Sequence, residues 1–191
     1  MAAPNSSGAP PPSSSLVAMT SRPKPPTVLE PLSSIHDAAT FDCGAAKTAC
    51  SEINEFIRHK ALHAQESLEN ETFILRYSDD KKIRAFITLA AGSLQPKQLK
   101  VDGWDTPITG THIAYLGADL SVAHGHWGRF LVDWAIRRCE ELGAIRTIHL
   151  FAYPDMVAYY EGIGFDKWGK APVDNTGQPR QLMILDMLEA T

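Results

Sequence analysis

The sequence predicts an α/β fold in which helices cover both faces of one mixed, twisted sheet. Two observations predict it. In the first half of the chain, two β-branched or aromatic runs at 72–77 and 83–90 are joined by the polar turn 78–82, as in a β-hairpin. In the second half, strand-like and helix-like segments alternate, which is typical of parallel strands joined by helices. Together the two patterns predict a sheet that contains both strand directions.

Each element follows from a local pattern. Residues 1–34 hold eight of the thirteen prolines, so we expect a disordered Pro/Ser-rich tail there and a single domain over residues 35–191. Two prolines and two glycines predict a loop over 95–110. Gly143 suits the stop position of the helix before it. The remaining predicted elements are helices at 47–64, 128–142 and 155–161 and strands at 111–119, 145–152 and 181–188, of which the first two strands are parallel.

The composition excludes several classes of protein. A chain of 191 residues with net charge −4 suits one domain and argues against a broadly basic nucleic-acid-binding surface. No apolar run approaches the ~18 residues of a membrane helix, and the start of the chain lacks the apolar core of a signal peptide. Three cysteines cannot all pair, which suits a reducing compartment. We therefore expect a cytoplasmic protein with no membrane segment.

The stretch 115–131 (YLGADLSVAHGHWGRFL) contains the first candidate site. A strand leads into a loop with Gly125 and Gly128, and a helix begins near Gly128. The unpaired N–H groups and the dipole at a helix start attract anions, and small residues let a phosphate approach the backbone. Glycines at such a place also serve as plain turns, so the stretch alone leaves an anion site and a turn both open.

The stretch 151–165 (FAYPDMVAYYEGIGF) contains the second candidate site. The predicted short helix after a strand end carries Tyr159 and Tyr160, and Gly162 and Gly164 then turn the chain. A phenol with an ordinary pKa of ~10 is protonated at neutral pH and is able to donate its proton to a leaving group. The alternative is that both tyrosines are packing residues.

Taken together, the two stretches resemble the GNAT superfamily of N-acetyltransferases. That family has a loop of the pattern Gln/Arg-x-x-Gly-x-Gly/Ala before a long helix, and later a Phe-Tyr-x-x-x-Gly-Phe pattern. Residues 159–165 (YYEGIGF) match the second pattern, and residues 123–128 (AHGHWG) occupy the place of the first. The segments 41–44 (FDCG), 53–58 (INEFIR) and 116–119 (LGAD) resemble the acetyltransferase toxins of toxin–antitoxin pairs.

The resemblance implies a GNAT-like acetyltransferase domain with acetyl-CoA as co-substrate. In this family, the strand before the loop splays from its neighbour and pairs with the pantetheine arm, and a backbone N–H there faces the thioester oxyanion. In the same family, backbone amides of the loop bind the pyrophosphate, and the phenol protonates the coenzyme A thiolate. These roles fall on Leu116, Gly117 and Ala118 for the pantetheine, His124, Gly125, His126, Trp127 and Gly128 for the pyrophosphate, Arg129 for a phosphate, and Tyr160 for general acid catalysis.

The acceptor and the base stay open at this stage. The resemblance to the toxins implies that the acceptor is the amino group of aminoacyl-tRNA, and a small-molecule or protein amine is the alternative. It also implies an antitoxin protein as a partner and a homodimer as the assembly. His112 and Asp119 are candidates for a base. His59 and His63 stand four residues apart, but no third ligand accompanies them, so we expect no metal. The alternative function is a GNAT-fold binding or assembly module with impaired catalysis.

Overall fold

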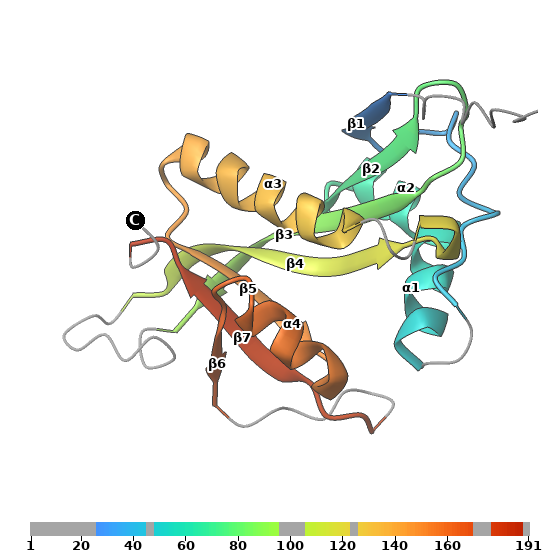
Figure 1. Cartoon of the computed structure of the whole chain (residues 1–191). Coiled ribbons are helices and arrows are strands. Elements are labelled where there is room, and N and C mark those ends of the chain that lie inside the picture. The colour runs from blue at the N-terminus through green and yellow to red at the C-terminus, as the bar shows by residue number, and fades with distance from the viewer. Residues whose placement is uncertain (1–25, 45–47, 96–105, 123–125, 170–176, 189–191) are drawn as a thin grey trace, which may run out of the picture.

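The computed structural model describes residues 26–44, 48–95, 106–122, 126–169 and 177–188. The described residues form one seven-stranded sheet in the order β1-β2-β3-β4-β5-β7-β6 (Figure 1). The strands are β1 (Thr27–Pro31), β2 (Glu71–Tyr77), β3 (Ala85–Leu94), β4 (Ile108–Ala118), β5 (Thr147–Ala152), β6 (Asp166–Trp168) and β7 (Gln181–Asp186). The α-helices are α1 (Thr48–His59), α2 (Ala61–Glu66), α3 (Trp127–Leu142) and α4 (Val157–Glu161).

The sheet has mixed strand directions, as predicted. The pairs β1–β2, β2–β3 and β3–β4 are antiparallel, as are β5–β7 and β6–β7. The one parallel pair is β4 with β5. It joins the two segments that the sequence predicted to be parallel, with α3 between them in the chain.

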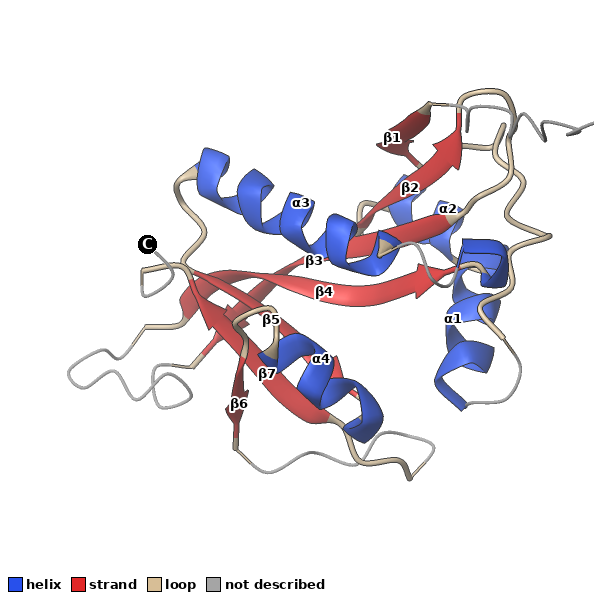
Figure 2. Ribbon diagram, viewed as in Figure 1, coloured by secondary structure: helices blue, strands red, loops and turns tan. Residues whose placement is uncertain are grey.

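Helices pack on both faces of the sheet, because strand residues alternate in the face they present. On β2, Phe73 and Leu75 belong to the larger apolar core, which α3 and α4 cover with residues such as Leu131. Ile74, between them, belongs to the second core, which α1 and α2 cover with residues such as Ile57. Figure 2 shows α3 and α1 on opposite sides of the sheet. The predicted fold class is therefore confirmed.

Several predicted boundaries are wrong. The expected disordered tail extends too far, because Thr27–Pro31 forms the edge strand β1 and pairs with β2. An edge strand tolerates a proline that has no N–H to donate, which is why the proline-rich composition concealed it. The predicted helix 47–64 is divided at Lys60 into α1 and α2. The predicted loop 95–110 ends sooner, since β4 begins at Ile108, and the short strand β6 was missed.

Within the described part of the chain, no helix combines the length and the apolar character needed to cross a bilayer.

Candidate active site

The site lies where β4 and β5 separate. The two strands pair over only three positions, Gly110–His112 with Thr147–His149. Beyond these, β4 continues to Ala118 and pairs with β3 alone, with a register shift opposite Thr88 and Leu89. The β5-facing edge of β4 therefore carries backbone N–H and C=O groups that the described strands leave unpaired. This confirms the splay that the family resemblance implies.

A first pocket of about 440 Å³ lies between the end of β4 and the start of α3. We call it the helix-start pocket. Met156 and Tyr159 complete its wall from the other side. All of the predicted cofactor residues that the structure describes line it, namely Leu116, Gly117, Ala118, His126, Trp127, Gly128 and Arg129. The predicted His124 and Gly125 lie outside the described residues.

The start of α3 presents free backbone donors to the helix-start pocket. The first amides of this 16-residue helix have no partner inside the helix, and the side chain of the N-cap residue His126 forms no capping hydrogen bond among the described residues. His126, just before the helix, has a left-handed backbone with φ of 56°. The indole of Trp127 does not close the pocket, because it packs edge-on against Tyr77 with ring centroids 5.7 Å apart. The helix start is thus available to an anion.

Two of the predicted residues also have packing roles. A Cβ on Gly117 would lie 2.8 Å from both Ile53 and Phe86, so the glycine lets α1 approach β4. A Cβ on Gly128 would lie 3.3 Å from the hydroxyl of Tyr159.

Arg129 lies at the rim of the helix-start pocket, where its Nε donates to an Asp133 oxygen at 2.8 Å. Its charge is therefore shared with a carboxylate in this structure.

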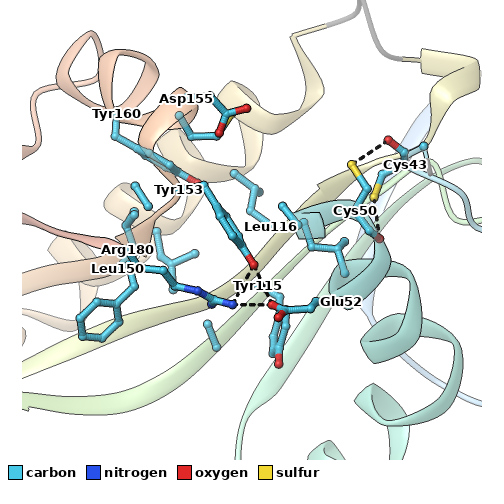
Figure 3. Close-up of a pocket in the computed structure, with 18 of the residues that line it drawn as sticks. Cys43, Cys50, Glu52, Tyr115, Leu116, Leu150, Tyr153, Asp155, Tyr160 and Arg180 are labelled. Carbon is cyan, nitrogen blue, oxygen red and sulfur yellow. Dashed lines mark hydrogen bonds and ion pairs between the residues drawn. The ribbon is translucent and has the colours of Figure 1, made fainter. Parts of the chain in front are cut away.

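A second pocket of about 420 Å³ lies between α1, β4 and β5. We call it the tyrosine pocket, because Tyr160 lines it (Figure 3). Its walls come from α1, from the splayed parts of β4 and β5, and from the segment after β5. Leu116 and Met156 line both pockets, so the two pockets adjoin at these residues.

Tyr160 is suited to donate a proton. Its side chain is 7% exposed, and its ring packs against Phe165 with centroids 5.8 Å apart. Burial, reinforced by the neighbouring Tyr159, raises the pKa of the Tyr160 hydroxyl above its ordinary value. The phenol therefore stays protonated at neutral pH, and among the described residues none forms a hydrogen bond with its hydroxyl.

A polar cluster that the sequence analysis missed lies on the wall of the tyrosine pocket. It consists of Glu52 on α1, Tyr153 after β5 and Arg180 before β7 (Figure 3). The Tyr153 hydroxyl donates to Glu52 Oε2 at 2.8 Å, and Arg180 pairs with the same oxygen. Arg180 also donates to the Tyr153 hydroxyl at 2.7 Å. No local sequence pattern marks these residues, because they are far apart in the chain and only the fold joins them.

Two cysteines line the same pocket but have no nucleophilic role that the structure supports. Cys43 and Cys50 are both free thiols, and each donates to the backbone carbonyl of the other, at 3.6 and 3.3 Å. Burial, together with the neighbouring Cys50, raises the pKa of the Cys43 thiol to about 12. Because the thiolate is the reactive form, Cys43 is inert at neutral pH.

The two residues considered as bases lie outside the tyrosine pocket. Asp119 accepts hydrogen bonds from the Asp42 N–H at 3.1 Å and from Ser121, and it pairs with Lys82 at 3.3 Å. Burial alone would raise the pKa of Asp119, but these hydrogen bonds together lower it. Asp119 thus has a structural role.

His112 also lies elsewhere, in the paired part of β4, where its ring centroid is 4.9 Å from that of His149. Burial lowers the pKa of His112. As for metals, the described part of the chain holds no group of three or more potential side-chain ligands. The side chain of His59 is 64% exposed, and its Nε2 lies 3.9 Å from Glu55 Oε2.

Comparison with solved structures identifies the fold. No family model matches the sequence. A structure of a bacterial toxin superposes with a TM-score of 0.74 at 16% identity, over 86% of this chain and 93% of the toxin. The fold is the GNAT fold. Two further structures of the toxin AtaT, also at 16% identity, cover 86% of this chain. AtaT complexed with acetyl-methionyl-tRNAfMet has a TM-score of 0.68 over 97% of its chain. A Tyr-to-Phe mutant bound to acetyl-CoA and the C-terminus of the antitoxin AtaR has a TM-score of 0.64 over 95% of its chain.

Proposed function

We propose that the protein is an N-acetyltransferase that moves acetyl from acetyl-CoA to a primary amine. The observation that carries this proposal is the meeting of two pockets at Leu116 and Met156, in the gap between β4 and β5. One pocket has a free helix start, and the other has a buried phenol. The likeness in fold to AtaT, which has been solved with acetyl-CoA, supports it.

The residues of the helix-start pocket fit acetyl-CoA. The amides and dipole at the start of α3 suit a pyrophosphate. The unpaired edge of β4 at Leu116, Gly117 and Ala118 suits the amides of the pantetheine arm, which would pair there like an added strand. A coenzyme bound in this way would hold its thioester toward the tyrosine pocket, since Leu116 borders both pockets.

The chemistry needs an amine, an oxyanion donor and an acid. A backbone N–H of the β4 edge would stabilise the negative charge that develops on the carbonyl oxygen. The amine nitrogen attacks the carbonyl carbon directly, so the C–N bond forms without an acyl-enzyme. Tyr160 then gives its proton to the sulfur as the C–S bond breaks. The raised pKa of its hydroxyl keeps that proton in place at neutral pH until the thiolate forms.

We further propose that the acceptor is the amino group of an aminoacyl-tRNA and that the protein acts as a toxin held by an antitoxin. The likeness in fold to AtaT, solved with acetyl-methionyl-tRNAfMet and with the C-terminus of AtaR, supports this choice over a small-molecule or protein amine.

A binding module with the same fold is the second candidate. The left-handed backbone of His126, where the family pattern has glycine, and the pairing of Arg129 with Asp133 favour it. The imidazole of His126 adds bulk where a phosphate must approach the backbone, and the carboxylate of Asp133 competes with a phosphate for Arg129.

Labelled acetyl transfer separates these functions. Protein, labelled acetyl-CoA and charged bulk tRNA are mixed, and the label in the RNA fraction is counted. The proposal predicts labelled, deacylation-sensitive RNA. Label on amino-acid esters or polyamines but not on RNA would assign a different amine acceptor. No label on any amine would favour the binding module.

A further inference from the structure

We propose that Glu52 binds the ammonium group of the acceptor and takes the proton that the amine must lose before it attacks. This inference rests on the proposed acetyltransferase function and supplies its missing base. A primary amine arrives in water mostly as ammonium, which has no lone pair for attack. A carboxylate beside the reacting atoms both attracts that cation and accepts its proton.

The position of Glu52 fits this role. Its side chain is 33% exposed and lines the tyrosine pocket, which Tyr160 enters from a different wall (Figure 3). Glu52 comes from α1, whereas Tyr160 comes from α4. The acid and the proposed base thus face one cavity of about 420 Å³ from separate elements, which leaves space for an amine between them.

The hydrogen bonds of Glu52 leave one oxygen available. Tyr153 and Arg180 both bind Oε2, and Oε1 has no partner among the described residues. Tyr153 and Arg180 are therefore positioning residues, which fix the carboxylate with Oε1 open to a ligand. The guanidinium of Arg180 lies 4.6 Å from the centroid of the Tyr153 ring, which holds the pair together in turn.

The other groups that line the pocket are less suited. The titratable or charged residues among them are Cys43, Cys50, Glu52, Tyr115, Tyr153, Asp155, Tyr160 and Arg180. Arg180 repels an ammonium, and the raised pKa of Cys43 and of Tyr160 keeps both protonated. Asp155 is the one other carboxylate in this set, and it is exposed in the turn that precedes α4. Asp155 is therefore the competitor that the experiment must include.

The proton balance closes with the groups present. One ammonium proton passes to Glu52 Oε1, and the freed lone pair forms the C–N bond with the thioester carbonyl. The C–S bond breaks as Tyr160 protonates the sulfur, and the phenolate takes the second nitrogen proton directly or through water. Glu52 releases its proton to solvent, so one proton is produced for each acetyl group transferred.

The test compares Glu52→Gln with Glu55→Gln and Asp155→Asn in the full chain. Glu55 lies on the same helix, pairs with Lys60 at 3.6 Å and does not line the pocket, so it is the matched control. Gln keeps the shape of the side chain and an oxygen for Tyr153 and Arg180, but it does not take a proton. Acetyl-CoA affinity, thermal melting and the pH profile of kcat/KM for charged bulk tRNA are measured for each protein.

We expect Glu52→Gln to lower kcat/KM by about 10²-fold or more near neutral pH. The deficit should shrink above about pH 8, where an α-amine is already neutral. The affinity for acetyl-CoA should not change in either variant, because neither Glu52 nor Glu55 lines the helix-start pocket. The rates of Glu55→Gln should equal those of the wild type, because Glu55 does not line the tyrosine pocket.

Four outcomes contradict the inference, each in a distinct way. A deficit that is the same at every pH indicates a structural role for Glu52 alone. A loss with Asp155→Asn but not with Glu52→Gln transfers the role to Asp155. Wild-type protein that acetylates no amine overturns the proposed function itself, whereas an active wild type with an equally active Glu52→Gln overturns only the role of Glu52.

Discussion

Replacing Tyr160 with phenylalanine removes one hydroxyl and leaves the ring in place. The ring makes the packing contacts, with centroids 5.8 Å from Phe165 and 5.1 Å from Tyr159. The hydroxyl faces the tyrosine pocket and forms no hydrogen bond with the described residues. No buried partner is therefore left unpaired, and we expect the free energy of unfolding to change by less than about 1 kcal/mol.

The same substitution should abolish most turnover. Burial holds the pKa of Tyr160 above its ordinary value, so the wild-type hydroxyl is fully protonated and available as an acid. Loss of a positioned acid lowers kcat by about 10²–10⁴-fold, which corresponds to about 3–5 kcal/mol of barrier. Tyr160 does not line the helix-start pocket, so the affinity for acetyl-CoA should stay the same.

Steady-state acetyl transfer, a thermal melt and calorimetric titration with acetyl-CoA check this prediction. Tyr159→Phe is the matched control, because Tyr159 is the adjacent phenol but lines the helix-start pocket instead. It should retain kcat within a few fold. A Tyr160→Phe variant that is folded, binds acetyl-CoA and turns over at the wild-type rate would refute the acid role.

Three further substitutions test the structural account. His126→Gly should raise the free energy of unfolding by about 0.5–1 kcal/mol in urea titration, since glycine adopts the left-handed backbone without strain. An unchanged free energy of unfolding would show that the backbone of His126 is not strained. Gly117→Ala should cost about 1–3 kcal/mol, because its Cβ would clash with Ile53 and Phe86; wild-type stability would show that the core yields. Burial, reinforced by a neighbouring histidine, lowers the pKa of His149 to about 4. Between about pH 4 and 6.5 the unfolded chain therefore binds more protons than the folded chain, so the free energy of unfolding should decrease as the pH is lowered through this range. His149→Gln should make the free energy of unfolding less dependent on pH there.

The helices and central strands were predictable from sequence because their periodicity reports burial directly. In α3, Leu131, Ala135 and Cys139 recur at helical spacing, and all three are buried in the structure, whereas the neighbouring Phe130 is 47% exposed. The edges were not predictable in the same way. β1 ends at Pro31 within a proline-rich segment, and its place in the sheet depends on pairing with β2, which is distant in the sequence.

The candidate site was predictable only where it is local in the chain. The end of β4, the start of α3 and Tyr160 follow motifs, and the structure brings them to two adjoining pockets. Glu52, Tyr153 and Arg180 follow none, since their contacts span 101 and 128 residues. The acceptor side of the site is therefore a product of tertiary structure.

The binding of acetyl-CoA tests the central claim most directly. At 100 times its dissociation constant, acetyl-CoA should stabilise the folded protein by about 2.7 kcal/mol, which raises Tm by about 5–10 °C for a chain of this size. Gly128→Asp places a carboxylate at the helix start and should remove the shift. A wild-type protein whose Tm does not move at millimolar acetyl-CoA would contradict the account.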